Sequence, residues 1–304
     1  MDALRSLLNT PANRPAMVEK AAGYGADALI LDLEDSVPLD EKAEARLIAR
    51  EALGRSVTSG LVQYIRVNAA ASGLLVDDLD AIVAPGLRGI QLPKVAGPSE
   101  ITDVDTRLSA LEAARGLPVG GIELLVSLES ARGVFFAYEI LAAGARVGSV
   151  MLGTAEGGDL QGDMGYLTTD DDRQLAYLRA KVILAARVVG LTNPIDGVYA
   201  RVRDLDGLEA TARRAREFGY RGKKLIHPAQ IDVVHRVFTP TPAELDHAER
   251  VIATFEAALL RGEATAVVDG AMVDYAMADT ARRLLARAGR THPAAAHQLG
   301  GDRP

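Results

Sequence analysis

Short apolar stretches alternate with helix-like segments along most of the chain, and a turn signal follows each stretch. Eight apolar stretches have the length of strands: Leu4–Leu8, Ala28–Leu33, Val62–Val67, Gly89–Leu92, Ile122–Leu128, Val147–Leu152, Ile195–Tyr199 and Lys224–Ile226. Apolar residues recur with helical spacing in eight further segments: Ala16–Gly23, Glu41–Leu53, Leu74–Ile82, Ser99–Ala114, Val134–Ala143, Asp171–Val189, Leu205–Phe218 and Ala229–Val237. This alternation is typical of a parallel sheet, and eight units predict a closed α/β fold, the TIM (β/α)8 barrel.

An open, doubly wound sheet is the alternative to a closed barrel. No glycine-rich phosphate-binding fingerprint follows the first predicted strand, which argues against a dinucleotide-binding fold. The chain has 304 residues, and barrels of alternating strands and helices often reach this length as one domain.

The alternation stops at the Thr-Pro-Thr-Pro sequence of residues 239–242, where two prolines end the preceding helix. Thr241 is a suitable cap for a helix over Ala243–Arg261. A short segment with Asp-Gly turn chemistry, Ala266–Asp274, and a last helix, Asp279–Ala288, follow. We therefore expect a barrel over residues 1–237, a C-terminal helical arm or lid over residues 238–288, and a loose tail over residues 289–304.

Composition narrows the class of protein. The hydrophobic fraction is 48% and the charged fraction 25%, which is ordinary for a globular protein with a sizeable core. The net charge is −7 and no basic cluster stands out, so we expect no nucleic-acid partner. No apolar run is long enough to span a membrane, and no export signal is recognisable at the N-terminus, so we expect a cytoplasmic protein. The absence of cysteine excludes disulfides, thiolate nucleophiles and Cys-ligated metals.

Polar side chains follow six of the eight predicted strands at the point where each strand ends. In chain order they are Asp32, Glu34, Asp35, Arg66, Asn68, Lys94, Glu129, Glu156, Asp159 and His227. Because the carboxyl ends of parallel strands meet at one rim of a barrel, we expect these side chains to gather there. Acidic, basic and amide side chains gathered at this rim are typical of the active site of a barrel enzyme.

Two carboxylates, Glu129 and Asp159, are the central pair of this set. They come from neighbouring predicted strands, and two hard oxygen ligands suit a divalent cation that keeps positions open for substrate and water. Structural alternatives exist: Glu129 could begin a helix, and Asp159 could brace a turn. Arg66, inside an apolar strand, requires an anionic partner, either Glu34 or Asp35 or an oxyanion of the substrate.

At this point the motifs match a known family. The chain resembles the citrate lyase β-subunit-like group of the HpcH/HpaI aldolase/citrate lyase superfamily, which includes malyl-CoA and citramalyl-CoA lyases. The similarity is carried in order by RSLLNTPANRPAMVEKA (5–21), GADALILDLEDSV (25–37), YIRVN (64–68), GIQLPKV (89–95), LESARG (128–133), GDLQGDMG (158–165), GKKLIHPAQI (222–231) and DGAMVDYA (269–276). Each motif is weak alone, but eight in register are specific.

The resemblance implies a TIM barrel with a C-terminal helical extension and a residue-by-residue site. It implies Mg²⁺ bound by Glu129 and Asp159, with Arg66 in contact with the substrate and Glu34 in support. It also implies that Asp274, in the arm, reaches the active site of an adjacent subunit. Proteins of this group are commonly trimers or hexamers, so we expect a homotrimer or homohexamer.

The loop over residues 153–160 departs from the pattern of the family. It is two residues longer than the usual Gly-Ala-Glu-Asp-Leu and richer in glycine. In register with the residues that follow, Asp159 aligns as the metal ligand, and Glu156 is the alternative ligand. The resemblance implies that this loop lines the pocket of the oxo acid, through Thr154 and Ala155.

The function predicted from the resemblance is that of a Mg²⁺-dependent carbon–carbon lyase. It would cleave a 3-hydroxyacyl-CoA, such as malyl-, citramalyl- or citryl-CoA, reversibly into a 2-oxo acid and an acyl-CoA, with the CoA thioester as substrate. One alternative is an aldolase or thioesterase-like enzyme with a similar metal site but a non-CoA acyl or aldehyde partner. Another alternative is a non-catalytic, lyase-like subunit that binds an acyl carrier.

Overall fold

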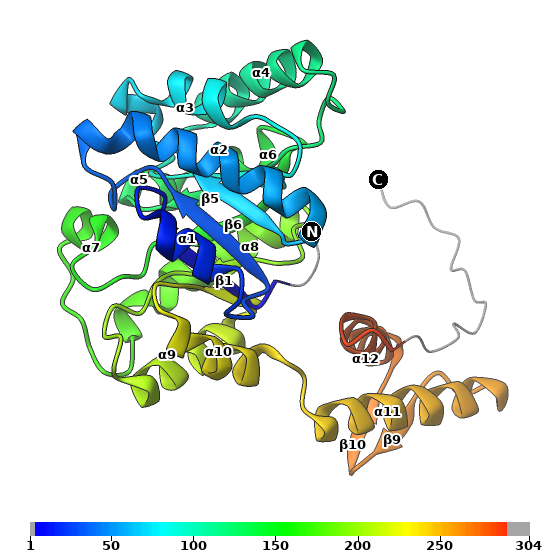
Figure 1. Cartoon of the computed structure of the whole chain (residues 1–304). Coiled ribbons are helices and arrows are strands. Elements are labelled where there is room, and N and C mark those ends of the chain that lie inside the picture. Colours follow the sequence, from blue (N-terminus) through cyan, green and yellow to red (C-terminus); the bar gives the residue numbers. More distant parts are fainter. Residues whose placement is uncertain (1–3, 291–304) are drawn as a thin grey trace. The chain divides into compact units, whose positions relative to one another are not determined.

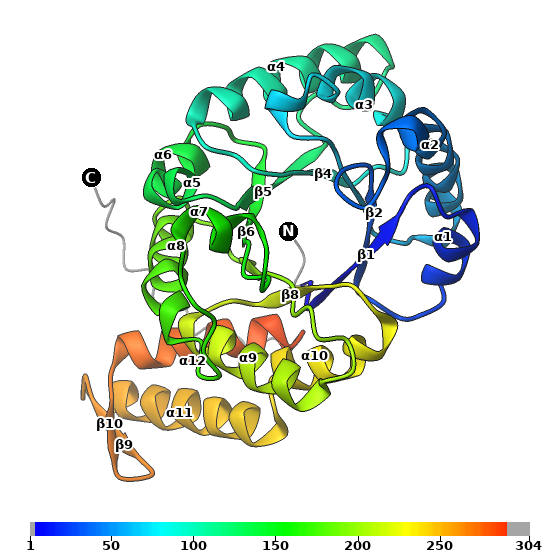
Figure 2. The same ribbon diagram turned by 90° about the vertical axis from the view of Figure 1, so that its left-hand side faces the viewer.

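The computed structural model describes residues 4–290. For Thr58 it describes the backbone but not the side chain. Within this range eight parallel strands form a closed barrel in the order β1 to β8, and β1 pairs with β8 to close it (Figures 1 and 2). The strands are β1 Ser6–Pro11, β2 Ala28–Asp32, β3 Gln63–Arg66, β4 Gly89–Leu92, β5 Glu123–Leu128, β6 Val147–Leu152, β7 Ile195–Asp196 and β8 Gly222–Leu225. The predicted TIM barrel is confirmed.

Helices surround the ring of strands, as the view along the barrel in Figure 2 shows. The main helices are α1 Pro15–Ala21, α2 Lys42–Ser59, α3 Leu75–Ile82, α4 Pro98–Ala114, α5 Ala131–Phe135, α6 Ala137–Ala142, α7 Asp159–Met164, α8 Ala176–Val188, α9 Leu205–Phe218 and α10 Ile231–Phe238. Short 3₁₀ turns join some of them: η1 Leu39–Glu41, η2 Ala70–Ser72, η3 Arg173–Leu175 and η4 Pro228–Gln230.

The predicted helix over residues 134–143 is in fact two short helices, α5 and α6, that meet at Phe136. The first begins earlier than predicted, because the Ser130 side chain caps it by accepting a hydrogen bond from the backbone N–H of Gly133 (3.0 Å). A further short helix, α7, begins at Asp159 and was not predicted.

Apolar side chains fill two regions of the barrel. The larger cluster includes Leu29, Leu31, Ile65 and Val126, together with apolar residues of the surrounding helices. A smaller cluster holds Leu7, Ile30, Tyr64, Leu125, Met151 and Ile195. Since successive side chains of a strand point to opposite faces, one set packs against the helices and the other fills the barrel interior. This packing holds the ends of the strands, and with them the polar side chains of the rim, in place.

A second compact unit begins after Phe238 and has its own apolar core. Its elements are α11 Pro242–Leu260, β9 Ala266–Val268, β10 Ala271–Val273 and α12 Tyr275–Arg287. Thr241 caps α11 as expected, in a capping box with Glu244. The last helix begins at Tyr275 and not at Asp279, since the Asp274 side chain caps it by accepting a hydrogen bond from the N–H of Met277 (3.1 Å).

Two further expectations from the sequence concern the C-terminal tail and the absence of a membrane-spanning segment. Of the tail expected over residues 289–304, residues 291–304 lie outside the described residues. Among residues 4–290, no helix combines the length and the apolar character needed to cross a membrane.

Candidate active site

Glu129 and Asp159 line one cavity at the C-terminal rim of the barrel, here called the rim cavity. Its volume is about 170 Å³, and it is lined by Asp35, Arg66, Glu129, Met151, Gly153, Thr154, Ala155, Gly158, Asp159, Leu160, Val198 and Lys224. Glu129 directly follows β5, and Asp159 is the first residue of α7. The structure thus brings the two residues of the predicted metal pair to one cavity.

Glu129 is a buried carboxylate to which no side chain or backbone group among residues 4–290 donates a hydrogen bond. Its side chain is 9% exposed, and its Oε1 atom has no hydrogen-bond partner among the described residues. Burial raises the pKa of Glu129, because an ionised carboxylate is poorly solvated there. Asp159, by contrast, has a half-exposed side chain. A cation seated between them would satisfy the orphaned oxygen of Glu129.

A glycine makes room for the Glu129 side chain. Gly153 follows β6, and its backbone N–H donates to the carbonyl oxygen of Leu128 (2.9 Å). A Cβ atom added at Gly153 would lie only 2.9 Å from Cγ of Glu129. A larger residue at this position would therefore displace the carboxylate.

Arg66 is held at the rim by two carboxylates of the β2 end. Its Nε and Nη2 atoms donate to Oδ1 and Oδ2 of Asp32 (2.6 and 2.5 Å), and its Nη1 atom lies 2.8 Å from Oε2 of Glu34. Glu34, predicted as a partner, is confirmed, and Asp32, which was not predicted as one, provides the bidentate contact, whereas Asp35 is 3.9 Å away. The β2–β3 register pairs Asp32 directly with Arg66.

These contacts shift the pKa values of both acids. Burial would raise the pKa of Asp32, but the charge and hydrogen bonds of Arg66 outweigh burial and hold that pKa well below its usual range. Burial has the larger effect on Glu34 and raises its pKa to about 7. Asp32 therefore remains ionised as the anchor of Arg66, whereas Glu34 can exchange a proton near neutral pH.

Lys94 joins three acids of the rim. It follows β4 with a left-handed backbone (φ 56°), which is uncommon for a residue other than glycine. Its Nζ atom lies 3.2 Å from Glu34, 3.1 Å from Asp35 and 3.5 Å from Asp159. The ammonium thus links the Arg66 cluster to one side of the predicted metal pair.

Lys224 is a member of the rim cavity that was not predicted as a site residue. Its side chain is almost fully buried, and its Nζ atom donates to Oε1 of Gln91 on β4 (3.1 Å). Burial, followed by the nearby charge of Arg66, lowers the pKa of Lys224 to about 7. Two adjacent lysines in a buried strand were the available signal, because consecutive residues of a strand face opposite sides.

The loop after β6 separates the candidate residues into two groups. Thr154 and Ala155 line the rim cavity, and Oγ1 of Thr154 is buried without a hydrogen-bond partner among the described residues. Glu156 does not line this cavity; its carboxylate pairs with Arg201 (3.0 Å). The geometry thus favours Asp159 over Glu156 beside Glu129.

Two other candidates have local structural roles. His227 is exposed, and its Nδ1 atom accepts a hydrogen bond from the N–H of Ala229 (3.1 Å) at the start of η4. Asp274 lies in the second unit, where it caps α12. His227 is not among the residues that line the rim cavity.

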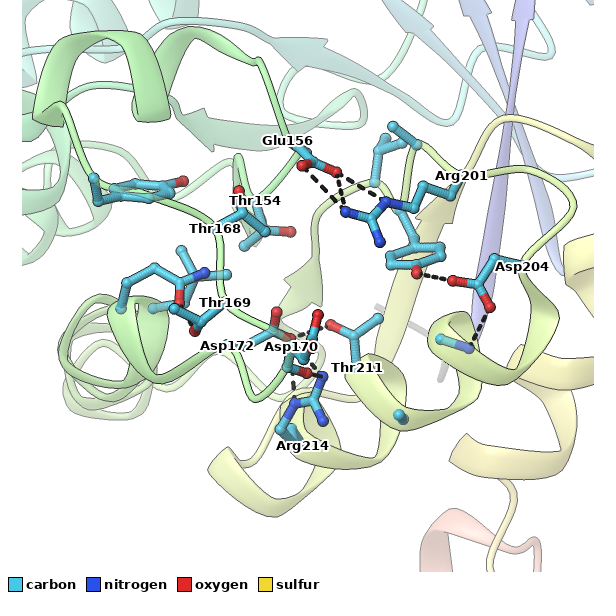
Figure 3. Close-up of a pocket in the computed structure, with 18 residues that line it drawn as sticks. Thr154, Glu156, Thr168, Thr169, Asp170, Asp172, Arg201, Asp204, Thr211 and Arg214 are labelled. Carbon is cyan, nitrogen blue, oxygen red and sulfur yellow. Dashed lines mark hydrogen bonds and ion pairs between the residues drawn. The ribbon is translucent and has the colours of Figure 1, made fainter.

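A larger cavity of about 240 Å³ adjoins the same loop and is shown in Figure 3. It shares Thr154 and Val198 with the rim cavity. Its charged lining consists of four carboxylates and two guanidiniums: Glu156, Asp170, Asp172, Asp204, Arg201 and Arg214. Both guanidiniums already pair with acids, as the dashed lines in Figure 3 show. This excess of acid makes the cavity unsuitable for a polyanion such as a phosphate chain.

The rim cavity suits a magnesium ion better than a metal held by many protein ligands. Among residues 4–290, no group of three or more His, Cys, Asp or Glu side chains is arranged to hold a metal. Magnesium commonly takes only one or two carboxylates and keeps waters or substrate oxygens as its other ligands. The orphaned Oε1 of Glu129 and the nearby Asp159 fit that requirement.

Comparisons with known proteins agree with this geometry. Residues 5–228 match the family described as HpcH/HpaI aldolase/citrate lyase. The citrate lyase subunit beta of Escherichia coli (strain K12) is 35% identical over 284 residues, which is 93% of each chain. The (3S)-malyl-CoA thioesterase of Cereibacter sphaeroides (strain KD131) is 38% identical over 93% of this chain and 94% of its own.

A solved structure is similar over nearly the whole chain. The protein CitE of Mycobacterium tuberculosis, in complex with magnesium, acetoacetate and coenzyme A, superimposes with a TM-score of 0.75 at 29% identity. The match covers 94% of this chain and 98% of that one. The chain therefore belongs to the HpcH/HpaI aldolase/citrate lyase family and is a lyase of the citrate lyase β-like type, as its motifs predict.

Proposed function

We propose that this chain is a Mg²⁺-dependent carbon–carbon lyase acting on a 3-hydroxyacyl-CoA such as malyl-, citramalyl- or citryl-CoA. The products would be a 2-oxo acid and an acyl-CoA, and the reaction would be reversible. The buried, unpartnered carboxylate of Glu129, in one cavity with Asp159 and Arg66, is the observation that carries the proposal. The similar CitE protein was crystallised with magnesium and coenzyme A, which supports the same assignment here.

The charge balance at the rim supports a divalent cation. Five carboxylates, those of Asp32, Glu34, Asp35, Glu129 and Asp159, stand against the three basic side chains Arg66, Lys94 and Lys224. The formal excess of two negative charges would be neutralised by one Mg²⁺. Without that ion, anionic substrates would meet a rim of their own sign.

The side chains of the chain supply the remaining chemistry. Glu129 and Asp159 would hold the magnesium ion, which would polarise the oxygen atoms of the bound acid. Arg66 has its guanidinium oriented by Asp32 and Glu34, so it can donate to an oxyanion that develops on the thioester. The rigidity of this guanidinium matters, since a preoriented donor needs no reorganisation during the reaction.

Proton transfer at the substrate carbon requires a further acid–base group. We propose Asp274 of an adjacent subunit for this role, in a homotrimer or homohexamer, because the DGAMVDYA motif over residues 269–276 matches the family pattern that implies it. The capping hydrogen bond holds one oxygen of Asp274, Oδ1, in a fixed place at the start of α12. Mixing an Asp274→Asn variant with an Arg66→Lys variant should restore activity by forming intact sites in mixed assemblies.

The direct test is turnover of the three thioesters with and without Mg²⁺, with 2-oxo acid and acyl-CoA both measured. Glu129→Gln should abolish Mg²⁺-dependent cleavage while the far-UV circular dichroism stays that of the wild type. Glu123→Gln is a matched control, because Glu123 stands at the other end of the same strand and bonds to Tyr64 (2.8 Å). Full activity of the wild type in a chelator would overturn the proposal.

A thioesterase is the second candidate, favoured by the 38% identity to the (3S)-malyl-CoA thioesterase. The two activities give different products from malyl-CoA: hydrolysis yields malate and free CoA, whereas carbon–carbon cleavage yields glyoxylate and acetyl-CoA. Product analysis of one reaction mixture distinguishes them. A subunit that only binds an acyl carrier would give neither set of products.

A further inference from the structure

Lys224 ends in the interior of the barrel, below the rim. It belongs to β8, and its Nζ atom reaches across to Gln91 of β4 (3.1 Å). Gln91 is itself fixed, because its Nε2 atom donates to Oγ of Ser127 on β5 (2.7 Å). The amine is thus held in place at one side of the rim cavity by a neutral amide.

The amine of Lys224 has no carboxylate partner in the part of the chain that the structure describes. Among residues 4–290, no Asp or Glu oxygen lies within 4.0 Å of Nζ of Lys224, and Gln91 is its one hydrogen-bond acceptor. An ammonium has three donors, so two remain unused. The preceding residue is the contrast: Nζ of Lys223 is equally buried but lies 2.5 Å from Asp196 on β7.

A buried basic group without an acid is costly unless something else supplies the acid. The charges of Asp32, Glu129 and Glu34 attract the amine only from beyond ion-pair distance, and Arg66 repels it. The open side of Lys224 faces the rim cavity, which contains the predicted metal pair at the same time. An anionic ligand in the cavity would therefore supply the negatively charged partner that the amine of Lys224 lacks.

We propose that Lys224 binds a second carboxylate of the acid and so makes the site selective for a 2-oxo dicarboxylic acid. This inference rests on the proposed lyase function, in which Glu129 and Asp159 take the 2-oxo carboxylate end of the acid through Mg²⁺. The far carboxylate then lies against Lys224. Pyruvate and glyoxylate lack this group and leave the amine unpaired.

The test is calorimetric titration of the full-length protein with Mg²⁺ and either oxaloacetate or pyruvate. A charge-assisted hydrogen bond of this kind is worth about 10- to 100-fold in affinity. Lys224→Met, which keeps the length of the side chain, should weaken oxaloacetate binding by that factor and change pyruvate binding far less. Lys224→Gln is a second variant in case the first fails to fold, and Lys181→Met, on α8, is the control outside the barrel interior.

Three outcomes would overturn the inference. They are an equal loss for both acids, no loss for either acid, and an adduct of pyruvate on Lys224 that is trapped by borohydride reduction, which would assign the amine a covalent role. Failure of the proposed lyase function can be distinguished from failure of the inference about Lys224. If none of the thioesters is cleaved but oxaloacetate still binds through Lys224, the inference stands and the lyase proposal falls. If cleavage occurs and Lys224→Met binds oxaloacetate normally, the lyase proposal stands and the inference about Lys224 falls.

Discussion

The ion pair of Asp32 and Arg66 gives the sharpest test of how the rim is stabilised. Asp32 is fully buried and accepts hydrogen bonds from Arg66, from Oγ of Ser36 (2.5 Å) and from the backbone N–H of Glu34 (2.9 Å). The substitution Asp32→Asn keeps the shape of the side chain but removes its charge. It leaves the buried guanidinium with Glu34 as its remaining close carboxylate.

Breaking a buried ion pair in this way costs about 3–5 kcal/mol. We expect the lower end, about 3 kcal/mol, because Glu34 still lies 2.8 Å from Arg66. For a unit of the size of the barrel, Met1–Phe238, the loss corresponds to a fall in melting temperature of roughly 6–12 °C. The pair of Asp80 and Arg107 is the control, since it has similar distances (2.6 and 2.7 Å) but is about half exposed.

An exposed pair contributes about 0–1 kcal/mol, so Asp80→Asn should lower the melting temperature by no more than about 4 °C. Thermal unfolding followed by circular dichroism compares the two variants. The folded-state pKa of Asp32 is depressed, so its contribution is present above its unfolded pKa of about 3.9 and is lost as the pH falls through the folded value. The contribution of Asp32 itself should therefore not change between pH 8 and about pH 5, whereas Glu34, whose pKa is about 7, takes up a proton within that range. Equal shifts for both variants would refute the reasoning.

Three further predictions concern the site and the second unit. Gly153→Ala places a Cβ atom 2.9 Å from Cγ of Glu129 and should weaken Mg²⁺ binding by about 10-fold or more in calorimetry, with an unchanged circular dichroism spectrum. Asp159→Asn should weaken Mg²⁺ binding similarly, whereas Glu156→Gln should not; the opposite result would reassign the ligand. Thr241→Ala removes the cap of α11 and should cost about 1 kcal/mol, measured by hydrogen exchange of that helix; unchanged exchange would count against it.

The fold was predictable because its signal is distributed over many residues. Each strand is an apolar run and each helix an amphipathic one, so an error at one boundary does not alter the number of units. Boundaries failed where polar residues belong to strands. The first strand was predicted as Leu4–Leu8 but extends to Pro11, since the polar Asn9 and Thr10 continue its pairing with β2 toward the rim.

For the site, the sequence predicted which side chains lie at the rim of the barrel but not which of them contact one another. The position after a strand says which rim a side chain occupies, and on that basis Glu129, Asp159 and Arg66 were expected together. Partner choice depends on register, which the sequence does not reveal: the β2–β3 pairing makes Asp32 the partner of Arg66. The same limit applies to Glu156, which the bend of the loop turns toward Arg201 and away from the rim cavity.

Lys224 shows how much more a strict use of strand periodicity predicts. Two lysines in succession within a buried strand must face opposite sides of the sheet, so in a closed barrel one of them must face the interior. The helix-facing lysine can be paired by any acid of a neighbouring strand, as Asp196 does for Lys223. The interior lysine can meet other side chains of the barrel interior, as Lys224 meets Gln91, or a ligand of the rim cavity. The lack of an acid beside the interior cation is the basis of our proposal that the acid carries a second carboxylate. The pattern of residues along the strand predicts where this cation lies, and the structure shows that Gln91 is its neighbour.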